Sequence, residues 1–467
     1  MNNSSRKKVV IIGGGAAGTL VAFNLLLKTS PALDVTIVER FDALGQGVTY
    51  RTSEPWHRLS APASAMSVLE HDPDHFFQWV KDIAERHHPL LNKIPTGYDF
   101  LPRAIYGEYL SYVLNESIAK ALRRGSVFTS VRGEAVDLVF EKNVKQVILA
   151  DGNKLDADFV VLALGNLPSQ YPISRHLPVY KDPRYIHFPW DRDRVHRIRK
   201  SDSVLLLGTG KTAVDLAISL KSRGHAGEIA MMSKMALVPQ STHSFEGDLP
   251  DFNWISRQTS IRTIFHVLKN FADRGGLPAW QSMIDKLRPY IPSLWMGLDN
   301  EERKRFLRHL QLYWEAVRYR LAPEIEEQLN TLLRSGELKR IAARIHSLEA
   351  GSSGLEITFT TKKNTEPQCL RAGWVINCTG PRSDFSKFQH PLLVSLLAEG
   401  LMNHDPLSLG MNAMPDGRLI SYWGEAQDWL FTIGLPMKGV LWECTSIPEL
   451  RQQAARISHQ IGDLATR

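Results

Sequence analysis

The sequence predicts an α/β protein with two Rossmann-like units, the second inserted into the first, and an additional helical insert. Three observations carry this prediction. An apolar run enters a glycine-rich turn and then a helical pattern at Val9–Gly18, and the same order recurs at Val204–Ala213. The run Asp158–Gly165 is a buried-type strand that ends in glycine, which suits a parallel sheet. A strand that leads through such a turn into a helix presents backbone N–H groups to a pyrophosphate, so the sequence predicts two bound dinucleotides that exchange electrons.

The first turn, Gly13–Gly18, fits the dinucleotide fingerprint G-x-G-x-x-G. Gly13 permits the tight turn, Gly15 lets the backbone approach the pyrophosphate, and Gly18 lets the helix pack closely on the strand. The next predicted strand, Asp34–Glu39, ends in an acid where a carboxylate takes the ribose hydroxyls in this fold. The alternative is an ordinary glycine-rich turn with Glu39 as a solvated strand end, and the agreement of turn, context and acid disfavours it.

The second turn, Gly208–Ala213, resembles a P-loop but lacks its first glycine, because Leu205 occupies that position. It fits G-x-G-x-x-A, with alanine in place of the third glycine. The strand that follows ends in Ser233 and Lys234 instead of an acid. A hydroxyl and an ammonium accept a 2′-phosphate that a carboxylate would repel, so the pattern predicts NADPH over NADH. Alternatively, Lys234 is a surface lysine without a ligand.

The composition is that of an ordinary soluble globular protein, with 43% hydrophobic and 22% charged residues among 467. A formal net charge of +7 suits polyphosphate cofactors and an acidic substrate. The basic stretches Arg192–Lys200 and Arg303–Arg320 lie beside apolar residues at helical spacing, so we interpret them as solvated faces and expect no nucleic acid partner.

The three cysteines are scattered, without a C-x-x-C pair. This disfavours a disulfide-reductase mechanism, a disulfide framework and a zinc site, and we expect no metal. No apolar run is long enough to cross a membrane. The polar stretch Met1–Lys8 leads directly into the first predicted strand and does not fit a signal peptide, so we expect a cytoplasmic protein.

Further elements follow from local patterns. The strand-like run Trp374–Pro381 repeats the glycine-ending pattern, and Gly133–Asp151 alternates like an antiparallel meander. A second alternating pair, Arg340–Leu348 and Leu355–Thr361, flanks a turn at Gly351–Gly354.

Residues 250–335 are helical in pattern. Asp299 is a predicted N-cap, with Glu301 and Glu302 in the first turn and a long amphipathic run, Arg303–Arg320, behind them. Tyr313, Trp314 and Tyr319 form either a lid over a ligand or plain core, and aromatic residues at helical spacing are more often core.

Together these residues resemble flavoproteins with two dinucleotide-binding domains. The resemblance rests on the first fingerprint with Glu39, the turn at Gly165, the second fingerprint and the run Leu430–Gly434. Within that group the chain is similar to a bacterial FAD/NAD(P)-binding protein family related to class B flavin monooxygenases and to the lysine and ornithine N-hydroxylases. The resemblance covers nearly the whole chain, and its further motifs are Gly45–Tyr50, His57–Pro62, Asp72–Phe76, Pro102–Gly107, Asn377–Pro381 and Gly439–Glu443.

The resemblance implies FAD in the first unit and NADPH in the second. It implies an FAD-binding domain in two segments, 1–190 and 371–467, and an NAD(P)H-binding domain at 191–370 that contains the helical insert at about 250–335. Leu59–Pro62 would lie by the isoalloxazine ring, and Gly434 near the ribityl chain, with the helix after Pro448 offering its N-terminus to the flavin. Lys211 departs from the family pattern, which is usually apolar there, and it either contacts the pyrophosphate or lies at the surface.

The candidate cofactor-binding residues are therefore Gly13, Gly15, Ala16, Ala17, Gly18, Glu39, Arg40, Leu59, Ala61, Pro62, Gly165, Gly208, Thr209, Gly210, Lys211, Thr212, Ser233, Lys234, Gly380 and Gly434.

Four polar residues are candidates for a catalytic role. His57, Arg58 and Arg103 are the polar groups expected near the flavin, although His57 equally fits a hydrogen-bonded structural histidine. His187 precedes the second unit where class B monooxygenases carry the signature F-x-G-x-x-x-H-x-x-x-W-[P/D]. Here the spacing to Trp190 is one residue shorter and the Phe-x-Gly portion is missing. His187 therefore either helps to reposition the nicotinamide domain or is a polar linker residue, and the second reading is slightly favoured.

The expected function is that of an NADPH-dependent FAD monooxygenase. NADPH passes a hydride to flavin N5, and reduced flavin reacts with molecular oxygen to give a C4a-hydroperoxide that attacks a small amine, sulfur or carbonyl substrate. The alternatives are a flavin dehydrogenase or reductase without oxygen insertion, and a non-catalytic nucleotide-binding regulatory protein. The second fingerprint weighs against the regulatory protein. An oligomer is compatible with the sequence, with the helical insert as a lid or an interface.

Overall fold

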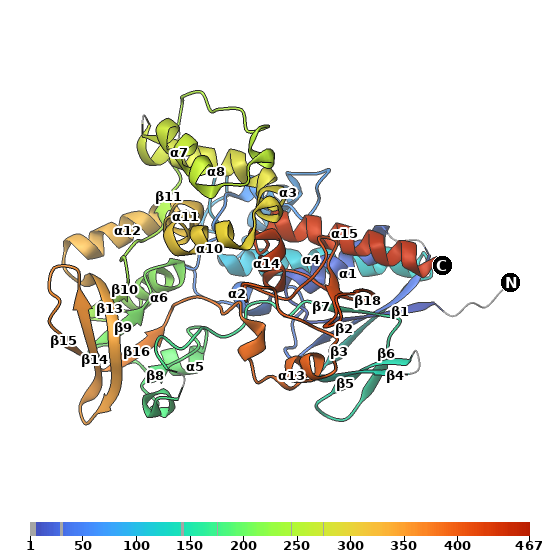
Figure 1. The fold of residues 1–467 in the computed structure, drawn as a ribbon, viewed down its shortest axis with the longest axis horizontal. Helices are drawn as coiled ribbons and strands as arrows, with labels where there is room; N and C mark the ends of the chain where they lie inside the picture. Colours follow the sequence, from blue (N-terminus) through green and yellow to red (C-terminus); the bar gives the residue numbers. More distant parts are fainter. Residues whose placement is uncertain (1–5, 29–30, 142–143, 175, 244, 274) are drawn as a thin grey trace.

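The chain forms two parallel sheets side by side, with a helical layer above them (Figure 1). The computed structural model describes residues 6–28, 31–141, 144–174, 176–243, 245–273 and 275–467, so the beginning of the polar stretch Met1–Lys8 lies outside it. Among the described residues no helix is both long enough and apolar enough to cross a membrane.

The first sheet has the strand order β17-β18-β7-β1-β2-β3. Its strands are β1 (Lys7–Ile12), β2 (Leu33–Glu39), β3 (Val127–Arg132), β7 (Phe159–Leu162), β17 (Arg418–Ile420) and β18 (Ala426–Thr432). All neighbours pair in parallel except β17 with β18. The predicted first and second strands, and the strand of Asp158–Gly165, are therefore confirmed as neighbours in one parallel sheet.

Alternating side chains of β1 enter two different cores. Val9 and Ile11 pack with the helices α1 (Ala16–Lys28), α4 (Arg103–Leu122) and α15 (Ile447–Ala465). Val10 and Ile12 pack on the opposite face with α13 (Pro391–Ala398) and the small sheet β4-β5-β6. The first sheet is thus covered on both faces, which explains why its central strands β1 and β7 contain continuous apolar runs.

The second sheet has the strand order β15-β14-β13-β10-β9-β16-β8. Its strands are β8 (Tyr185–Ile186), β9 (Val204–Leu207), β10 (Ile229–Ser233), β13 (Leu338–Gly351), β14 (Gly354–Thr361), β15 (Gln368–Ala372) and β16 (Trp374–Asn377). The pairs among β8, β16, β9, β10 and β13 are parallel, and β13-β14-β15 is an antiparallel meander. The helices α6 (Lys211–Ser222) and α12 (Pro323–Arg334) pack against this sheet.

The predicted antiparallel segments are confirmed. Residues 135–156 form β4 (Ala135–Glu141), β5 (Val144–Leu149) and β6 (Lys154–Asp156), and the predicted pair around Gly351–Gly354 forms β13 and β14.

Two strands lie beyond the boundaries that we expected between the two units. Tyr185–Ile186 and Trp374–Asn377, which we expected in the segments 1–190 and 371–467, both belong to the second sheet, because β16 pairs with β9 on one side and with β8 on the other. The second sheet therefore begins before residue 190 and ends after residue 371.

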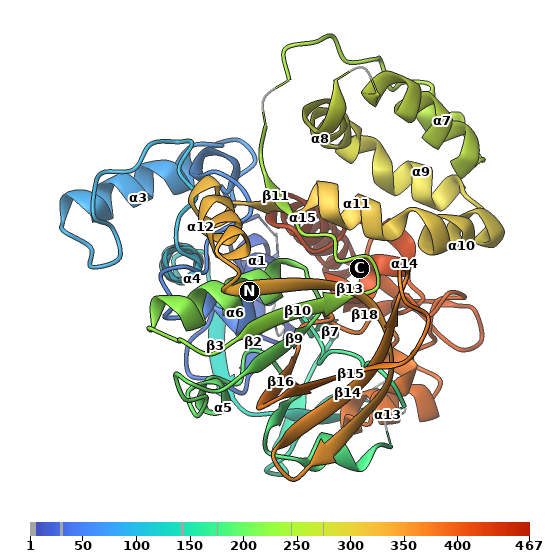
Figure 2. The same ribbon diagram turned by 90° about the vertical axis from the view of Figure 1, so that its left-hand side faces the viewer.

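The helical segment stands apart above the two sheets (Figure 2). It contains α7 (Ile261–Ala272), α8 (Gly276–Leu287), α9 (Ile291–Gly297), α10 (Asn300–His309) and α11 (Gln311–Arg318). The predicted N-cap is confirmed, because the Asp299 side chain accepts a hydrogen bond from the Glu302 amide at 2.9 Å. The amphipathic run Arg303–Arg320 is helical as predicted up to Arg318, but it is divided at Leu310 into α10 and α11. Its last residue, Arg320, begins the short strand β12 (Arg320–Leu321), which pairs with β11 (Gln240–Ser241). The break lets Phe306 and Trp314 meet, with ring centroids 6.1 Å apart.

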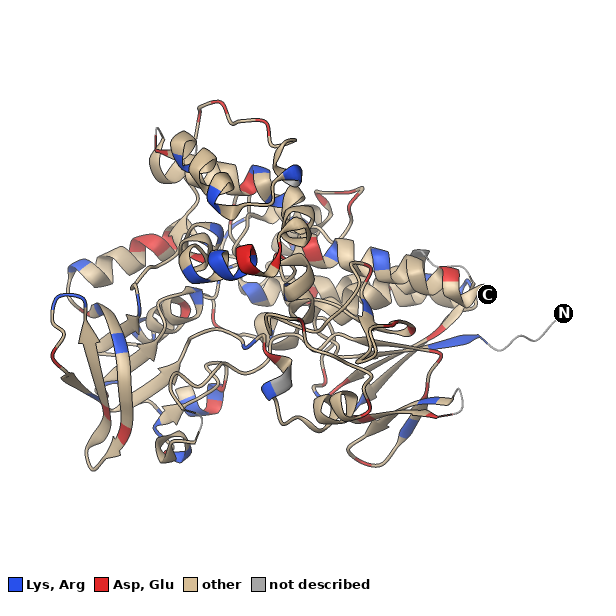
Figure 3. Ribbon diagram, viewed as in Figure 1, with Lys and Arg blue, Asp and Glu red and all other residues tan. Residues whose placement is uncertain are grey.

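The predicted basic stretches carry acids among their cations (Figure 3). On α10, Lys304 pairs with Glu301 and Arg305 pairs with Glu302. Arg199 likewise pairs with Asp202 at 3.0 Å. The exposed cations Lys304, Arg305 and Arg199 fit the interpretation of solvated faces, whereas Arg318 and Arg320 do not, because both are buried. The remaining helices are α2 (Gly47–Tyr50), α3 (His75–Glu85), α5 (Arg192–Val195) and α14 (Lys438–Leu441).

Candidate functional site

The two fingerprints occupy equivalent places in their sheets. Gly13 has φ +109° and Gly208 has φ +117°. A Cβ on Gly13 would lie 2.2 Å from the carbonyl oxygen of Ala163, and a Cβ on Gly208 would lie 2.5 Å from that of Cys378. A side chain is therefore excluded at each glycine, because it would collide with the residue that follows the neighbouring strand, which is β7 in one unit and β16 in the other.

In the first unit the turn is held by close backbone packing. A Cβ on Gly18 would lie 1.9 Å from the Gly13 oxygen, and one on Gly15 would lie 3.4 Å from Gly47. The Glu39 carboxylate accepts hydrogen bonds from the amides of Gly14 at 2.7 Å and Phe41 at 3.1 Å. The predicted strand-end acid therefore braces the fingerprint turn, and each of its oxygens has a further lone pair for a ribose hydroxyl.

Three other candidates of the first unit lie beside that turn. Ala16 is half-buried and Ala17 is buried at the start of α1. Arg40 is exposed, and its guanidinium lies 5.3 Å from the ring centroid of Phe41.

In the second unit the equivalent turn is more open. No atom lies within 4 Å of a Cβ built on Gly210. Thr209 is buried and its hydroxyl is 2.9 Å from that of Ser233, which also accepts a hydrogen bond from the Ala236 amide. The Ser233 hydroxyl is thus used in hydrogen bonds within the protein, whereas Lys234 beside it is exposed.

The remaining candidate backbone positions lie at strand ends and in one loop. Leu59 is buried and its amide donates to the Leu101 oxygen at 2.9 Å, while Ala61 and Pro62 after it are half-buried. Gly165 and Gly380, with φ +65° and +87°, have open space where a Cβ would stand. Gly434, with φ +82°, donates from its amide to Gln453 on α15 at 2.9 Å.

Arg103, His57 and Arg58, which we expected near the flavin, each contact a side chain of the second unit. Arg103 donates to the Asp215 carboxylate at 2.5 Å, and both side chains are buried. His57 lies 2.8 Å from the Thr52 hydroxyl and 3.2 Å from the Ser219 hydroxyl.

Two more ion pairs join the same surfaces. Arg58 pairs with Glu324 at the start of α12 at 3.3 Å, and Glu54 pairs with Arg223 directly after α6. We call this contact the inter-unit seam. Its first-unit side consists of Thr52–Arg58 and Arg103, and its second-unit side consists of α6, Arg223 directly after it, and Glu324. The sequence patterns did not single out Ser219 or Glu324, because only the fold brings them opposite His57 and Arg58.

Burial sets the protonation of two seam residues. It lowers the pKa of His57 to about 4, although Asp215 acts in the opposite direction. It also lowers the pKa of Lys211 to about 8, again opposed by Asp215. His57 is therefore neutral at neutral pH, as a hydrogen-bonded structural histidine would be.

His187 lies in the second unit, beside the end of β16. Its ring stacks on Tyr171, with centroids 4.2 Å apart and an interplanar angle of 17°. Its Nδ1 is 3.5 Å from the side-chain nitrogen Nδ2 of Asn377, the last residue of β16. Burial and the nearby Arg382 lower the pKa of His187. The structure does not bring His187 into the seam with His57.

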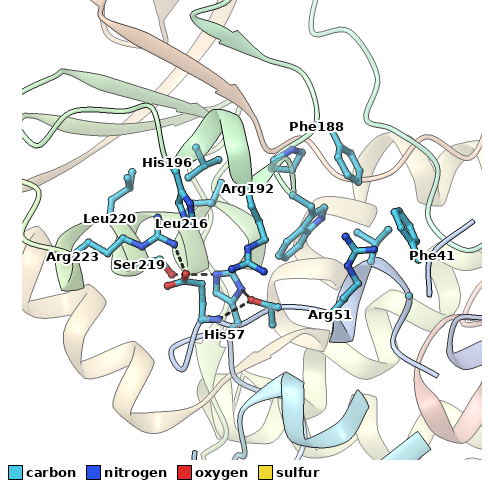
Figure 4. Close-up of a pocket in the computed structure, with 17 residues that line it drawn as sticks. Phe41, Arg51, His57, Phe188, Arg192, His196, Leu216, Ser219, Leu220 and Arg223 are labelled. Carbon is cyan, nitrogen blue, oxygen red and sulfur yellow. Dashed lines mark hydrogen bonds and ion pairs between the residues drawn. The ribbon is translucent and has the colours of Figure 1, made fainter. Parts of the chain in front are cut away.

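A pocket opens beside the seam between the two units (Figure 4). It contains about 750 Å³ of empty space, including space open to solvent. Three segments line it: residues 41–57 of the first unit, residues 188–196 of the connection, and residues 216–223 of α6 and the residue after it. The guanidinium of Arg51 lies 3.9 Å from the Phe41 ring centroid, and Arg192 donates to the Ser53 hydroxyl. Arginines on both sides give the pocket a basic wall.

No set of three or more His, Cys, Asp or Glu side chains that could hold a metal ion occurs in the described part of the chain. Cys378 and Cys444 are buried, and Cys369 is exposed.

Residues 10–167 match a protein-family model described as FAD-NAD(P)-binding. A search of the curated proteins finds no match. The fold is similar to that of an ornithine hydroxylase from Pseudomonas aeruginosa, at 17% identity and a TM-score of 0.65, over 99% of this chain and 100% of that one. It is also similar to L-lysine 6-monooxygenase from Pseudomonas syringae, at 16% identity and a TM-score of 0.64, with the same coverage.

A third similar structure is an ornithine N-hydroxylase from Kutzneria sp. 744 in complex with reduced FAD, NADP⁺ and L-ornithine. It is 13% identical, with a TM-score of 0.63, over 98% of this chain and 100% of that one. The family match supports the predicted resemblance for the first unit, and these structures confirm the predicted fold.

Proposed function

We propose that this chain is an FAD-dependent monooxygenase that uses NADPH and acts on a small amine. The observation that carries the proposal is the equivalence of the two fingerprints. In each, the first glycine packs against the carbonyl group of the residue after the neighbouring strand: Gly13 against Ala163, and Gly208 against Cys378. Two such turns, each at the start of a helix, suit two pyrophosphates. The family match over residues 10–167 supports a dinucleotide in the first unit.

The residues of the first unit fit FAD. A Cβ on Gly13 or Gly18 would close the turn, and Glu39 retains acceptor capacity for ribose hydroxyls. Gly165 and Gly434 would let the backbone approach the rest of the cofactor, with Leu59–Pro62 beside its ring. Gly380, in the loop after β16 of the second unit, would approach it from the other side of the contact. When bound, FAD supplies hydride acceptance from NADPH and the reaction with molecular oxygen.

The residues of the second unit fit NADPH. The pyrophosphate would lie on Gly208–Gly210 at the N-terminus of α6, where the helix dipole favours negative charge. Thr212 is half-buried in the first turn of that helix. The exposed ammonium of Lys234 would hold the 2′-phosphate, and Ser233 would support the loop that presents it.

The seam residues position the two cofactors instead of reacting. Arg103, His57 and Arg58 fix α6 and α12 against the first unit, so the N-terminus of α6 keeps one orientation. A fixed geometry is what hydride transfer between two bound cofactors requires. The neutral imidazole of His57 completes the hydrogen bonding of Thr52 and Ser219 without placing a charge in this buried contact.

The similar structures support a primary amine as the substrate class. Two of them act on ornithine and one on lysine by their names, and both compounds carry a primary amine. Sulfur and carbonyl substrates are the other classes for this chemistry. A flavin reductase without oxygen insertion has the same cofactors and is the second candidate function.

Flavin reduction under anaerobic conditions tests the proposal. We expect the purified protein to show a bound-flavin spectrum that NADPH bleaches faster than NADH does. Readmission of air with a primary amine should then yield a hydroxylamine. A protein that bleaches with NADPH but forms no oxygenated product with any amine, sulfide or ketone is a reductase.

Two variants separate the two cofactor sites. Gly210 has open space around it, so Gly210→Trp should fold, keep flavin and lose reduction by NADPH. Gly15→Trp, which would meet Gly47, should lose flavin. Normal reduction of Gly210→Trp by NADPH would contradict the assignment of the second unit.

A further inference from the structure

Lys211 carries a buried ammonium that has no hydrogen-bond partner among the described residues. It is the first residue of α6 and directly follows Gly210 of the second fingerprint. Its counterpart in the first unit is Ala16, which follows Gly15 in the same way. The second unit therefore places an amine where the first has only a methyl group. A buried cation without a partner is costly, so this amine either loses its proton or gains an anion.

The two acids near Lys211 form ion pairs with other cations. Asp215, one turn further along α6, accepts from Arg103 at the start of α4 through one carboxylate oxygen, and its other oxygen has no hydrogen-bond partner among the described residues. Glu324, at the start of α12, pairs with Arg58. The neutral His57 is a further titratable group of the seam near Lys211. Because neither acid forms an ion pair with Lys211, burial lowers the pKa of its amine to about 8, and the amine is only partly protonated at slightly alkaline pH.

The open space at Gly210 lies beside the backbone of Lys211, the next residue in the chain. Lys211 donates no hydrogen bond in the seam, so turning toward a ligand at the helix N-terminus breaks none. A pyrophosphate at that N-terminus would be an opposite charge within reach of the side chain, and such a charge favours the protonated amine. Ala16 could not respond in this way in the first unit.

We propose that Lys211 takes up a proton from solvent when the pyrophosphate of NADP⁺ binds to the second unit, and that its ammonium then contacts that pyrophosphate. This inference rests on the proposed NADPH site and adds a residue that couples cofactor binding to protonation. Lys211 is thus a cofactor-binding residue whose amine is buried in the seam while no cofactor is bound.

Isothermal titration calorimetry of the FAD-loaded protein with NADP⁺ tests this proposal. The heat of binding at pH 8 is measured in Hepes and in Tris, whose ionisation enthalpies differ, and the difference gives the number of protons taken up. We expect about half a proton at pH 8 and close to none at pH 6.5, where the amine is already protonated. Lys211→Arg should bind NADP⁺ without uptake at pH 8, because arginine is always charged. Lys211→Met should also show no uptake and weaker binding.

Lys234→Gln is the matched control, because it removes another lysine of the same proposed site. It should weaken NADP⁺ binding and leave the proton uptake unchanged. Binding by the unaltered protein without uptake at pH 8, or unchanged uptake in Lys211→Met, would overturn the role of Lys211 and leave the NADPH site standing. An absence of any binding heat would overturn the NADPH site itself.

Discussion

Arg103, the first residue of α4, donates a hydrogen bond to Asp215 in the middle of α6, at 2.5 Å and with both side chains buried. The two residues are far apart in the sequence, and their helices pack against different sheets. Together with the pairs Arg58–Glu324 and Glu54–Arg223, they join the two units across the seam.

Removal of one partner of this buried ion pair should destabilise the protein. We expect Arg103→Met to lower the free energy of unfolding by about 3–5 kcal/mol, because Asp215 would keep a buried charge without its cation. Denaturant unfolding measures the change. The double variant Arg103→Met with Asp215→Leu should recover part of the loss, and no recovery would mean that the pair does not act as a unit.

Two fingerprint glycines, one from each unit, should respond differently to alanine. Gly13→Ala should cost about 2–4 kcal/mol of stability, because its Cβ would lie 2.2 Å from the Ala163 oxygen at a positive φ. Gly210→Ala should change stability by about 0.5 kcal/mol or less, because its Cβ would meet nothing within 4 Å. Thermal unfolding of both variants checks the contrast, and similar losses would contradict the described geometry.

Lys234 should determine the choice between the two nicotinamide cofactors. Lys234→Gln removes a cation from the proposed 2′-phosphate site, so the ratio of kcat/KM for NADPH to that for NADH should fall about tenfold. Lys269→Gln, which alters an exposed lysine on α7, serves as the control. A ratio that stays the same in Lys234→Gln would place the 2′-phosphate elsewhere.

His57 should make stability depend on pH below neutrality. Its pKa is lowered from 6.5 to about 4 in the folded chain, so the unfolded chain binds the proton more readily. The stabilisation is present above pH 6.5 and is lost as the pH falls toward 4, by about 3 kcal/mol over that window. Unfolding free energies of the protein and of His57→Gln measure it, since the variant should lose this part of the slope. His346→Gln, at an exposed histidine, should keep it.

The sequence by itself determined the local architecture. Each fingerprint lies within one strand–turn–helix stretch, so its glycines, the acid Glu39 and the N-cap Asp299 are specified by residues a few positions apart. The two antiparallel pairs, such as β13 with β14, also follow from short-range alternation and turns.

Only the tertiary structure decided what these elements meet. It assigned Trp374–Asn377 to the second sheet, because strand pairing between β16 and β9 joins segments that no local pattern connects. It divided the amphipathic run Arg303–Arg320 into two helices, because packing of Phe306 with Trp442 and Trp314 outweighs helical continuity. It also buried Arg103 and His57 against α6 and placed Lys211, the first residue of α6, in the same contact. There burial, opposed in part by Asp215, lowers the pKa values of His57 and Lys211.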